Sequence, residues 1–355
     1  MTEDKGILIR NIFYMLTYAF QELCQNKYEK IATENFDNIH DLFAEILSRG
    51  IAYQLKQGLR REYVSKHETM SSLKGKLDID GSVKNLAARK RFLDCDYDEL
   101  SIDNIFNRII KTTAGLLVNH GEVRKDRKVA LKKLLLYFSE VSYIDPSRIV
   151  WSTLRFDSNS RTYRMLMYIC FFVLDNLVMR TESGEYAMHT FSDEHMSRLY
   201  EKFILEYYKR HHPECKPRAA QVKWNFDMGQ VSAESLAVLP IMQTDIFLEV
   251  GTRTLIIDAK YYSHSLSEHI GKYLLHSPNF YQINSYVLNY DTEHSGLVDG
   301  LLLYAQTQAE GGMDYKYPNK DGNVFYVKSL DLNQDFQSIK NQLDNIIINA
   351  KNTQS

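Results

Sequence analysis

Two aspartates and a lysine have a spacing that could bind a divalent cation. Asp245 lies in one apolar segment, and Asp258 and Lys260 end the next one, after a turn at residues 251–252. Such a turn joins antiparallel strands, and residues two apart on a strand point to the same face. Burying ionised groups at the end of a strand costs desolvation free energy unless the groups act together, as in binding one ligand. Two carboxylates with an ammonium can hold Mg²⁺, which prefers carboxylate oxygens and keeps water ligands for a substrate phosphate.

This Asp…Asp-x-Lys arrangement resembles the site of the PD-(D/E)xK nucleases. The short pattern alone is weak evidence, because an acid two residues before a lysine also occurs at Glu3–Lys5, Asp126–Lys128, Glu214–Lys216 and Asp314–Lys316. In contrast to these, Asp258–Lys260 ends an apolar strand and follows a second aspartate on the preceding strand of a hairpin. The alternative interpretation is a salt-bridged edge of that hairpin.

Three more residues are candidates for the same site. Gln282 and Tyr286 lie four apart, on one face of a predicted helix. They resemble the Gln-x-x-x-Tyr element of RecB-type nucleases, which lies beside the metal and contacts DNA, and they would position the scissile strand. Glu201 lies in the helix that opens this half of the chain, where nuclease folds of this type often direct a glutamate toward the metal; Glu206 is a rival. The alternatives are an interfacial tyrosine, a surface glutamine and an exposed helix glutamate.

Other kinds of chemistry have little support in the sequence. His211 and His212 are adjacent, and adjacent histidines seldom converge on one ion, so a polar loop after a helix explains them better. The chain has no Gly-x-x-x-x-Gly-Lys-Ser/Thr segment and hence no P-loop of its own. It also lacks a Gly-x-Ser-x-Gly nucleophile elbow. The favoured reaction is phosphodiester hydrolysis with Mg²⁺ as the cofactor.

The elements expected to position these groups form an α/β domain over residues 185–355. Strands and helices that alternate in this part of the chain predict a central mixed sheet. The expected elements are a helix over 192–211, strands over 236–250, 253–261, 299–305 and 323–332, and helices over 278–290 and 334–350.

Residues 1–184 are expected to form an α+β region that is richer in helices, since the pattern changes near residue 184. Its stretch from Lys74 to Arg91 holds six basic residues against two aspartates. That stretch is either a contact for phosphates or acidic groups of a partner, or a solvated loop. The expected elements are helices over 7–23, 38–57, 122–139 and 160–180, a helix capped by Ser101, and two short strands around a Ser-rich turn within 59–80.

Composition narrows the class of protein. The 355 residues suffice for about two domains. With 43 Lys+Arg against 45 Asp+Glu, the net charge of −2 excludes a protein that holds DNA by bulk positive charge. Four scattered cysteines argue against a disulfide framework. The most apolar segment, residues 165–174, is too short for a membrane span, and no secretory signal is present. We therefore expect a soluble cytoplasmic protein with no membrane contact.

Over most of its length the sequence resembles the McrC family, the nuclease subunits of McrBC modification-dependent restriction systems. The run from Arg10 to Ala19 resembles the family's opening Arg-Asn-Ile-x-Tyr-Met-Leu-x-Tyr-Ala. Thr244 stands where the PD-(D/E)xK pattern has proline, a common exchange that leaves the metal ligand in place. Further matches follow in order at residues 74–76, 107–113, 199–203, 244–245, 258–262 and 279–286.

The resemblance implies a division of labour. McrC-like subunits bind a ring of McrB, an AAA+ GTPase that also carries the domain reading methylated cytosine. Residues 1–184 would dock in that ring and stimulate GTP hydrolysis, and residues 185–355 would cut double-stranded DNA. Two alternatives remain: a non-catalytic adaptor that only activates the partner, and a stand-alone DNA repair nuclease.

The mechanism expected from these residues is metal-assisted hydrolysis. Asp245 and Asp258, with Glu201, would hold one or two Mg²⁺ ions, which lower the pKa of a bound water and neutralise charge on the phosphate. Lys260 would orient the attacking water or help to deprotonate it.

Overall fold

The protein is described by a computed structural model, and its chain divides into two compact units. The structure describes residues 3–4, 7–24, 28, 31, 34, 36, 38–157, 160–182, 185–227, 229–261, 266–269, 272–306 and 312–352. Unit 1 contains residues 1–42 and 179–355, and unit 2 contains residues 43–178.

This division differs from the boundary expected at residue 184, which itself lies outside the described residues. The first 42 residues belong with the C-terminal part of the chain. The reason is the apolar face of α1 (Ile9–Ala19), which packs against α8 (Glu185–His211). Asn11 strengthens this attachment, because its Nδ2 donates to the backbone oxygen of Leu332 at 2.7 Å.

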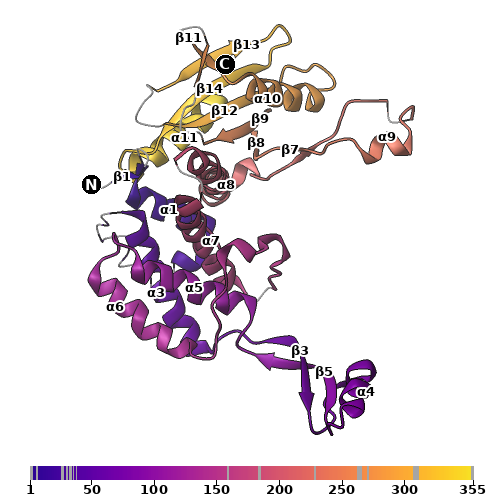
Figure 1. The fold of residues 1–355 in the computed structure, drawn as a ribbon. Helices are drawn as coiled ribbons and strands as arrows, with labels where there is room; N and C mark the ends of the chain where they lie inside the picture. The colour runs from indigo at the N-terminus through magenta and orange to yellow at the C-terminus, as the bar shows by residue number, and fades with distance from the viewer. Residues whose placement is uncertain are drawn as a thin grey trace. The chain divides into compact units, whose positions relative to one another are not determined.

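Unit 1 is built on a five-stranded mixed sheet with the strand order β13-β14-β12-β9-β8 (Figure 1). The strands are β8 (Ile246–Val250), β9 (Arg253–Lys260), β12 (Val298–Gln306), β13 (Asp314–Pro318) and β14 (Val324–Asp331). β9, β12 and β14 are parallel, whereas β8 and β13 pair antiparallel at the two edges. The central mixed sheet expected from the sequence is confirmed.

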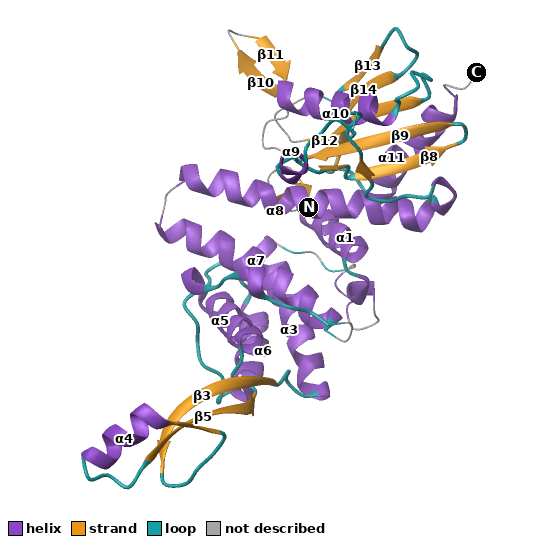
Figure 2. Ribbon diagram, turned by 90° about the vertical axis from the view of Figure 1, so that its right-hand side faces the viewer, coloured by secondary structure: helices purple, strands orange, loops and turns teal. Residues whose placement is uncertain are grey.

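Helices cover both faces of this sheet, which explains why its central strands are continuous apolar runs (Figure 2). α10 (Ser277–Tyr290) packs on the face that carries Ile256. Tyr261 points to the other face, where its ring lies 6.4 Å from that of Tyr200 in α8. α11 (Phe336–Asn352) packs beside α8 on that second face.

The strand expected over residues 236–250 is wrong in its first part. Residues Ala233–Ala237 form α9, and Ser232 begins this helix by accepting a hydrogen bond of 3.2 Å from a backbone N–H of the first turn. The rest divides into β7 (Met242–Gln243) and β8. β7 pairs with β6 (Gln221–Val222), so the segment between them extends away from the sheet (Figure 1).

The remaining described elements of unit 1 are short. They are β1 (Glu3–Asp4), β2 (Ile7–Leu8), the 3₁₀ turns Gln21–Cys24 and Pro213–Cys215, β10 (Leu266–His269) and β11 (Lys272–Leu275).

Unit 2 consists of packed helices and one β-ribbon. Its helices, of which the first and last reach beyond the unit, are α3 (Ile39–Gln57), α5 (Ile105–Asn119), α6 (Lys125–Leu135) and α7 (Arg161–Glu182). They lie close to the positions expected from their apolar spacing. The cap expected at Ser101 is wrong, because Asn104 caps α5 by accepting a hydrogen bond of 3.2 Å from the backbone N–H of Asn107. Among the residues described between α6 and α7 there are three 3₁₀ turns, at Leu136–Phe138, Pro146–Arg148 and Trp151–Thr153.

The ribbon projects from these helices and ends in α4 (Ile79–Ala87) (Figure 1). Two strands lie within residues 59–80 as expected, β3 (Glu62–Met70) and β4 (Lys76–Asp78), but they do not pair with each other. Both pair with β5 (Leu93–Ser101), which the sequence reasoning missed. The basic stretch is therefore not a plain loop: much of it is a helix, which Asp78 caps at its N-terminus.

Candidate active site

Asp245 and Asp258 lie next to each other because β8 and β9 are antiparallel. Ile246, the first residue of β8, pairs with Ile257. Asp245 directly precedes β8 and is therefore brought beside Asp258, near the end of β9. The backbone N–H of Ala259 fixes this arrangement by donating to Asp245 Oδ2 at 2.9 Å. The structure thus brings together the two carboxylates that the hairpin pattern predicted.

Lys260 joins the same site and connects it to α10. Its Nζ lies 3.1 Å from Asp258 Oδ1, 2.9 Å from Asp258 Oδ2 and 3.1 Å from Gln282 Oε1. Gln282 donates through Nε2 to the Tyr286 hydroxyl at 2.7 Å, and this hydroxyl donates to the backbone oxygen of Gln243 at 2.9 Å. A continuous hydrogen-bonded chain therefore runs from the end of β9 through α10 to β7.

Burial governs the ionisation of both aspartates. The side chain of Asp258 has no exposed surface, and Asp245 is partly buried. Desolvation raises the pKa of each carboxyl above its ordinary value, and the Lys260 ammonium opposes this shift. Two buried carboxylates beside one ammonium leave an excess of negative charge, so the pair favours binding a proton or a cation.

One oxygen of Asp258 has unused capacity to bind a cation. Oδ2 is buried, and its charged partner is the Lys260 ammonium, 2.9 Å away, which is shared with Asp258 Oδ1 and Gln282. One shared ammonium leaves lone pairs of this buried oxygen unused, and a hard cation binds oxygen donors of this kind. The residues present at this site therefore fit Mg²⁺.

Glu201 lies within electrostatic reach of the two aspartates. It is largely buried in α8 and accepts a hydrogen bond of 3.0 Å from the Ser197 hydroxyl. Burial, and then the charge of Asp245, raise the pKa of Glu201 to about 7, while Lys260 opposes the shift. Among the described residues, however, the groups whose ligand atoms all lie within 4.8 Å of each other do not include Glu201 with both aspartates.

Thr244 is a supporting residue that the sequence reasoning treated only as a replacement for proline. It is buried, and its backbone N–H donates to the Ala220 oxygen at 2.9 Å. Its Oγ1 donates to that same oxygen at 3.0 Å and accepts from the Ala220 N–H at 3.1 Å. A proline has no N–H and no hydroxyl, so it could make none of these bonds. No local signal identifies Ala220 as the partner, because it lies 24 residues earlier.

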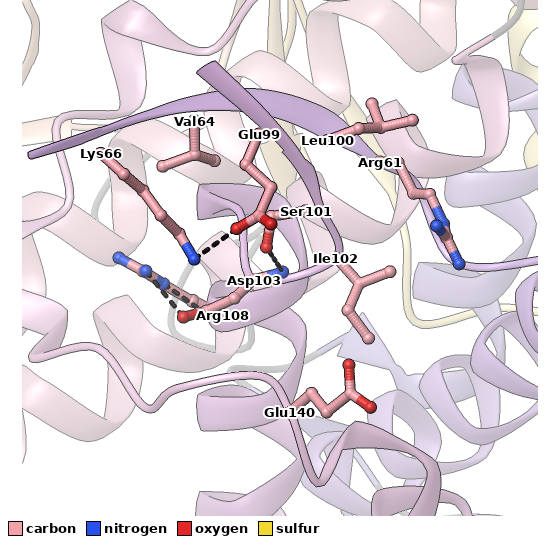
Figure 3. Close-up of a pocket in the computed structure, with 10 residues that line it drawn as sticks. All are labelled: Arg61, Val64, Lys66, Glu99, Leu100, Ser101, Ile102, Asp103, Arg108 and Glu140. Carbon is pink, nitrogen blue, oxygen red and sulfur yellow. Dashed lines mark hydrogen bonds and ion pairs between the residues drawn. The ribbon is translucent and has the colours of Figure 1, made fainter. Parts of the chain in front are cut away.

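A separate pocket of about 390 Å³ lies in unit 2, at the base of the ribbon (Figure 3). Its charged side chains largely neutralise one another. Lys66 pairs with Glu99 at 2.5 Å, and Arg108 donates to both oxygens of Asp103 at 2.7 and 2.8 Å. The hydrogen bonds from Arg108 lower the pKa of Asp103 to about 2. This network stabilises the junction of β5 and α5 and contains none of the candidate catalytic residues.

The fold and the site define a class: an α/β protein with paired carboxylates and a lysine at one end of a hairpin in its mixed sheet. Residues 3–305 match a family described as "McrBC 5-methylcytosine restriction system component", and the chain belongs to this family. It is similar to the Type IV methyl-directed restriction enzyme EcoKMcrBC of Escherichia coli (strain K12), at 28% identity over 343 residues. That match covers 96% of this chain and 97% of the relative.

Two solved structures from Thermococcus gammatolerans are also similar. One is the refined half-complex from a tetradecameric assembly of McrB AAA+ hexamers with bound McrC, with a TM-score of 0.44 and 16% identity over 95% of this chain and 78% of that chain. The other is the cryo-EM structure of the McrBC complex, with a TM-score of 0.39 and 19% identity over 57% of this chain and 58% of that chain.

Of the helices formed by the described residues, none is long and apolar enough to cross a bilayer.

Proposed function

We propose that the chain is the Mg²⁺-dependent endonuclease subunit of its restriction system and hydrolyses phosphodiester bonds in methylated double-stranded DNA. The observation that carries the proposal is the meeting of Asp245, Asp258 and Lys260, where two adjacent carboxylates, one of them fully buried, lie beside a single ammonium. A purely structural hairpin edge gives no reason to bury two carboxylates beside one ammonium. A metal-dependent nuclease of the PD-(D/E)xK type needs this combination.

Each of these side chains has a role in the proposed reaction. Asp245 and Asp258 would hold the metal, and Glu201 would have to approach them from α8 to serve as a further acidic ligand. Bound there, Mg²⁺ supplies a water of lowered pKa and neutralises charge on the phosphate. Lys260 orients the attacking water and offsets the negative charge that develops in the transition state.

In this proposal Gln282 and Tyr286 position other residues of the site and do not bind DNA themselves. Gln282 accepts a hydrogen bond from Lys260 and donates one to the Tyr286 hydroxyl. That hydroxyl donates in turn to the backbone oxygen of Gln243. Gln243 is two residues before Asp245. The pair therefore supports the ammonium on one side and the strand that leads to the first aspartate on the other.

We further infer that the partner is a ring of an McrB-like AAA+ GTPase, because McrC is bound to McrB AAA+ hexamers in the Thermococcus gammatolerans assembly. The ribbon of unit 2 is the element best suited to this contact. On α4, Ile79, Val83 and Leu86 form an exposed apolar face beside the basic residues of the 74–91 stretch. An apolar face rimmed by charge is typical of a protein interface, and the basic side chains could stabilise charge on the nucleotide.

One reconstitution tests both parts of the proposal. The purified chain is mixed with methylated plasmid and Mg²⁺, with and without the partner ring and GTP, and nicking and GTP turnover are measured together. Cleavage should require the partner and GTP. Asp258→Ala should abolish cleavage and leave GTPase stimulation intact, whereas Lys260→Ala should retain Mg²⁺ binding by calorimetry and lose turnover.

Three outcomes would contradict the proposal. Near wild-type cleavage by Asp258→Ala would place the active site elsewhere. Cleavage by the chain alone would favour a stand-alone repair nuclease. GTPase stimulation without cleavage under any condition would favour an adaptor.

A further inference from the structure

The outward face of α6 carries a concentration of positive charge. Its members are Lys125, Lys128, Lys132 and Lys133, and within the described ranges none of their ammonium groups pairs with a carboxylate. The nearby Asp126 is already engaged by Arg124, at 2.9 Å. The whole chain has a net charge of −2, so this positive charge is local to α6 and does not reflect an excess of basic residues in the chain.

The buried side of α6 fixes which side chains face outward. Leu131 is fully buried, and the buried Arg127 pairs with Glu45 Oε2 at 3.2 Å. The helical repeat then directs the exposed Lys125, Lys132 and Lys133 away from the unit, and the half-buried Lys128 lies at the edge of this face. Three apolar side chains continue the same surface: Val129, Leu136 and Tyr137, of which the last two are 76% and 67% exposed.

The stability of the helix does not explain this charge. Lys132 and Lys133 lie in the last turn, where the helix dipole favours a cation, but Lys125 opens the helix, where the dipole opposes one. Lys128 and Lys132 are four residues apart, and like charges at this spacing weaken a helix. Helix stability alone therefore does not account for the cluster, and its positive charge is available to a partner with negative charge.

We propose that this surface, Lys125, Lys128, Lys132 and Lys133 of α6, binds the phosphate backbone of duplex DNA; the inference rests on the proposed function in that the chain acts on DNA. The lysines span about 12 Å along the helix axis, and duplex DNA presents one charge in about every 1.7 Å of its axis. Protein interfaces are depleted in lysine and enriched in arginine, whereas lysines on flexible stems suit sequence-independent phosphate contact.

The test is the salt dependence of DNA binding by the full-length chain. A fluorescein-labelled, unmethylated duplex of about 30 base pairs is titrated in EDTA between about 50 and 200 mM KCl, where phosphate contacts dominate affinity. The variant is Lys125→Gln/Lys132→Gln/Lys133→Gln. The control, Lys56→Gln/Lys320→Gln/Lys351→Gln, removes the same charge from exposed lysines elsewhere.

The α6 variant should bind at least about tenfold more weakly, with a salt slope smaller by about 0.9 for each phosphate that is no longer neutralised, and the control should stay within about twofold of wild type. The matching Lys→Arg triple should restore binding. An unchanged slope, an equal loss in both triples, or a wild-type chain that does not bind duplex would overturn the proposal. An α6 variant that keeps its affinity for DNA but no longer binds the GTPase ring would also overturn it, because the face would then be a protein-binding surface.

This assay separates the two proposals. It needs neither metal nor cleavage, so its readout does not depend on the candidate catalytic residues. A failure of the nuclease assignment leaves the α6 result standing, and a failure of the α6 variant leaves the nuclease assignment standing.

Discussion

The ammonium of Lys260 lies against oxygens of two different residues, and in the proposed site this would hold it in place once a cation binds Asp258. A lysine ammonium has three N–H donors, and here Asp258 and Gln282 both accept from it. In the proposed metal-bound state the oxygens of Asp258 would face the cation, and the amide of Gln282 would still hold the ammonium in place. Gln282 would therefore matter most in that state, in which Lys260 is proposed to act.

Gln282→Leu tests this at the level of a single residue. It should lower kcat by about 10- to 100-fold, the usual loss when a group that orients an active-site residue is removed, while Kd for DNA stays unchanged. Single-turnover cleavage and DNA binding are measured side by side. Gln337→Leu, an exposed glutamine of α11, is the control. A weaker Kd with unchanged kcat would show that Gln282 contacts DNA instead.

Glu201 gives a second prediction, on pH. Because its pKa is raised from 4.5 to about 7 in the folded chain, the native state binds more protons than the unfolded state between these values, and stability falls as pH rises through them. Glu201→Gln removes this loss. Relative to wild type, the metal-free variant should gain about 1–3 kcal/mol of unfolding free energy between pH 4.5 and 8, measured by urea denaturation.

The matched control for this experiment is Glu214→Gln. A backbone hydrogen bond lowers the pKa of Glu214, so its contribution to stability is present above the unfolded pKa and the variant should change in the opposite direction. A pH-independent difference for Glu201→Gln would show that Glu201 ionises normally.

Among the elements, the join between β7 and β8 controls where Asp245 lies. Thr244→Val keeps the shape of the side chain and removes both hydrogen bonds of Oγ1 with Ala220. We expect a loss of about 1–3 kcal/mol of stability, because the partly buried Ala220 N–H loses its acceptor and the Ala220 oxygen loses one of its two donors, together with reduced cleavage. Thermal unfolding and nicking rates measure the two effects. Thr252→Val, at the exposed turn between β8 and β9, should change neither; equal effects of both variants would contradict this role for Thr244.

Whether a contact could be predicted from the sequence depends on how far apart its two residues lie along the chain. The hairpin that carries Asp245 and Asp258 and the four-residue spacing of Gln282 and Tyr286 are local, so periodicity and a turn were sufficient to place these residues together. The pairing of β3 with β5 and the bonds from Thr244 to Ala220 join distant segments and leave no local pattern. α9 was missed because Ser232 starts a helix within a run that is also apolar enough for a strand.

At the scale of the molecule, the N-terminal segment belongs to the unit with the nuclease candidate, and this changes which fragment should be stable. A fragment of residues 1–184 contains α1 without α8 and would expose its apolar face. A fragment of residues 38–182 contains α3 and α7 complete. The side chains exposed in the first fragment are Ile9, Ile12, Phe13, Met15 and Leu16.

We therefore expect 38–182 to be monomeric, to unfold cooperatively and to stimulate the partner GTPase. The 1–184 fragment should bind a hydrophobic dye and self-associate, as judged by fluorescence and size-exclusion chromatography. A monomeric 1–184 that binds no dye would show that α1 does not need α8. A folded 38–182 that leaves GTP turnover unchanged at saturation would place the activator in unit 1.

The packing of α1 on α8 also has a consequence for synthesis on the ribosome. α1 leaves the exit tunnel early, yet Phe203, which lies edge-on to Tyr18 with ring centroids 5.4 Å apart, is translated much later. At about 5–20 residues per second, the roughly 180 intervening residues take on the order of 10–40 seconds. During that time unit 2 is completed, while the apolar side of α1 has no permanent partner. The nascent chain should therefore be a client of chaperones that hold exposed apolar helices, and release should follow the emergence of α8.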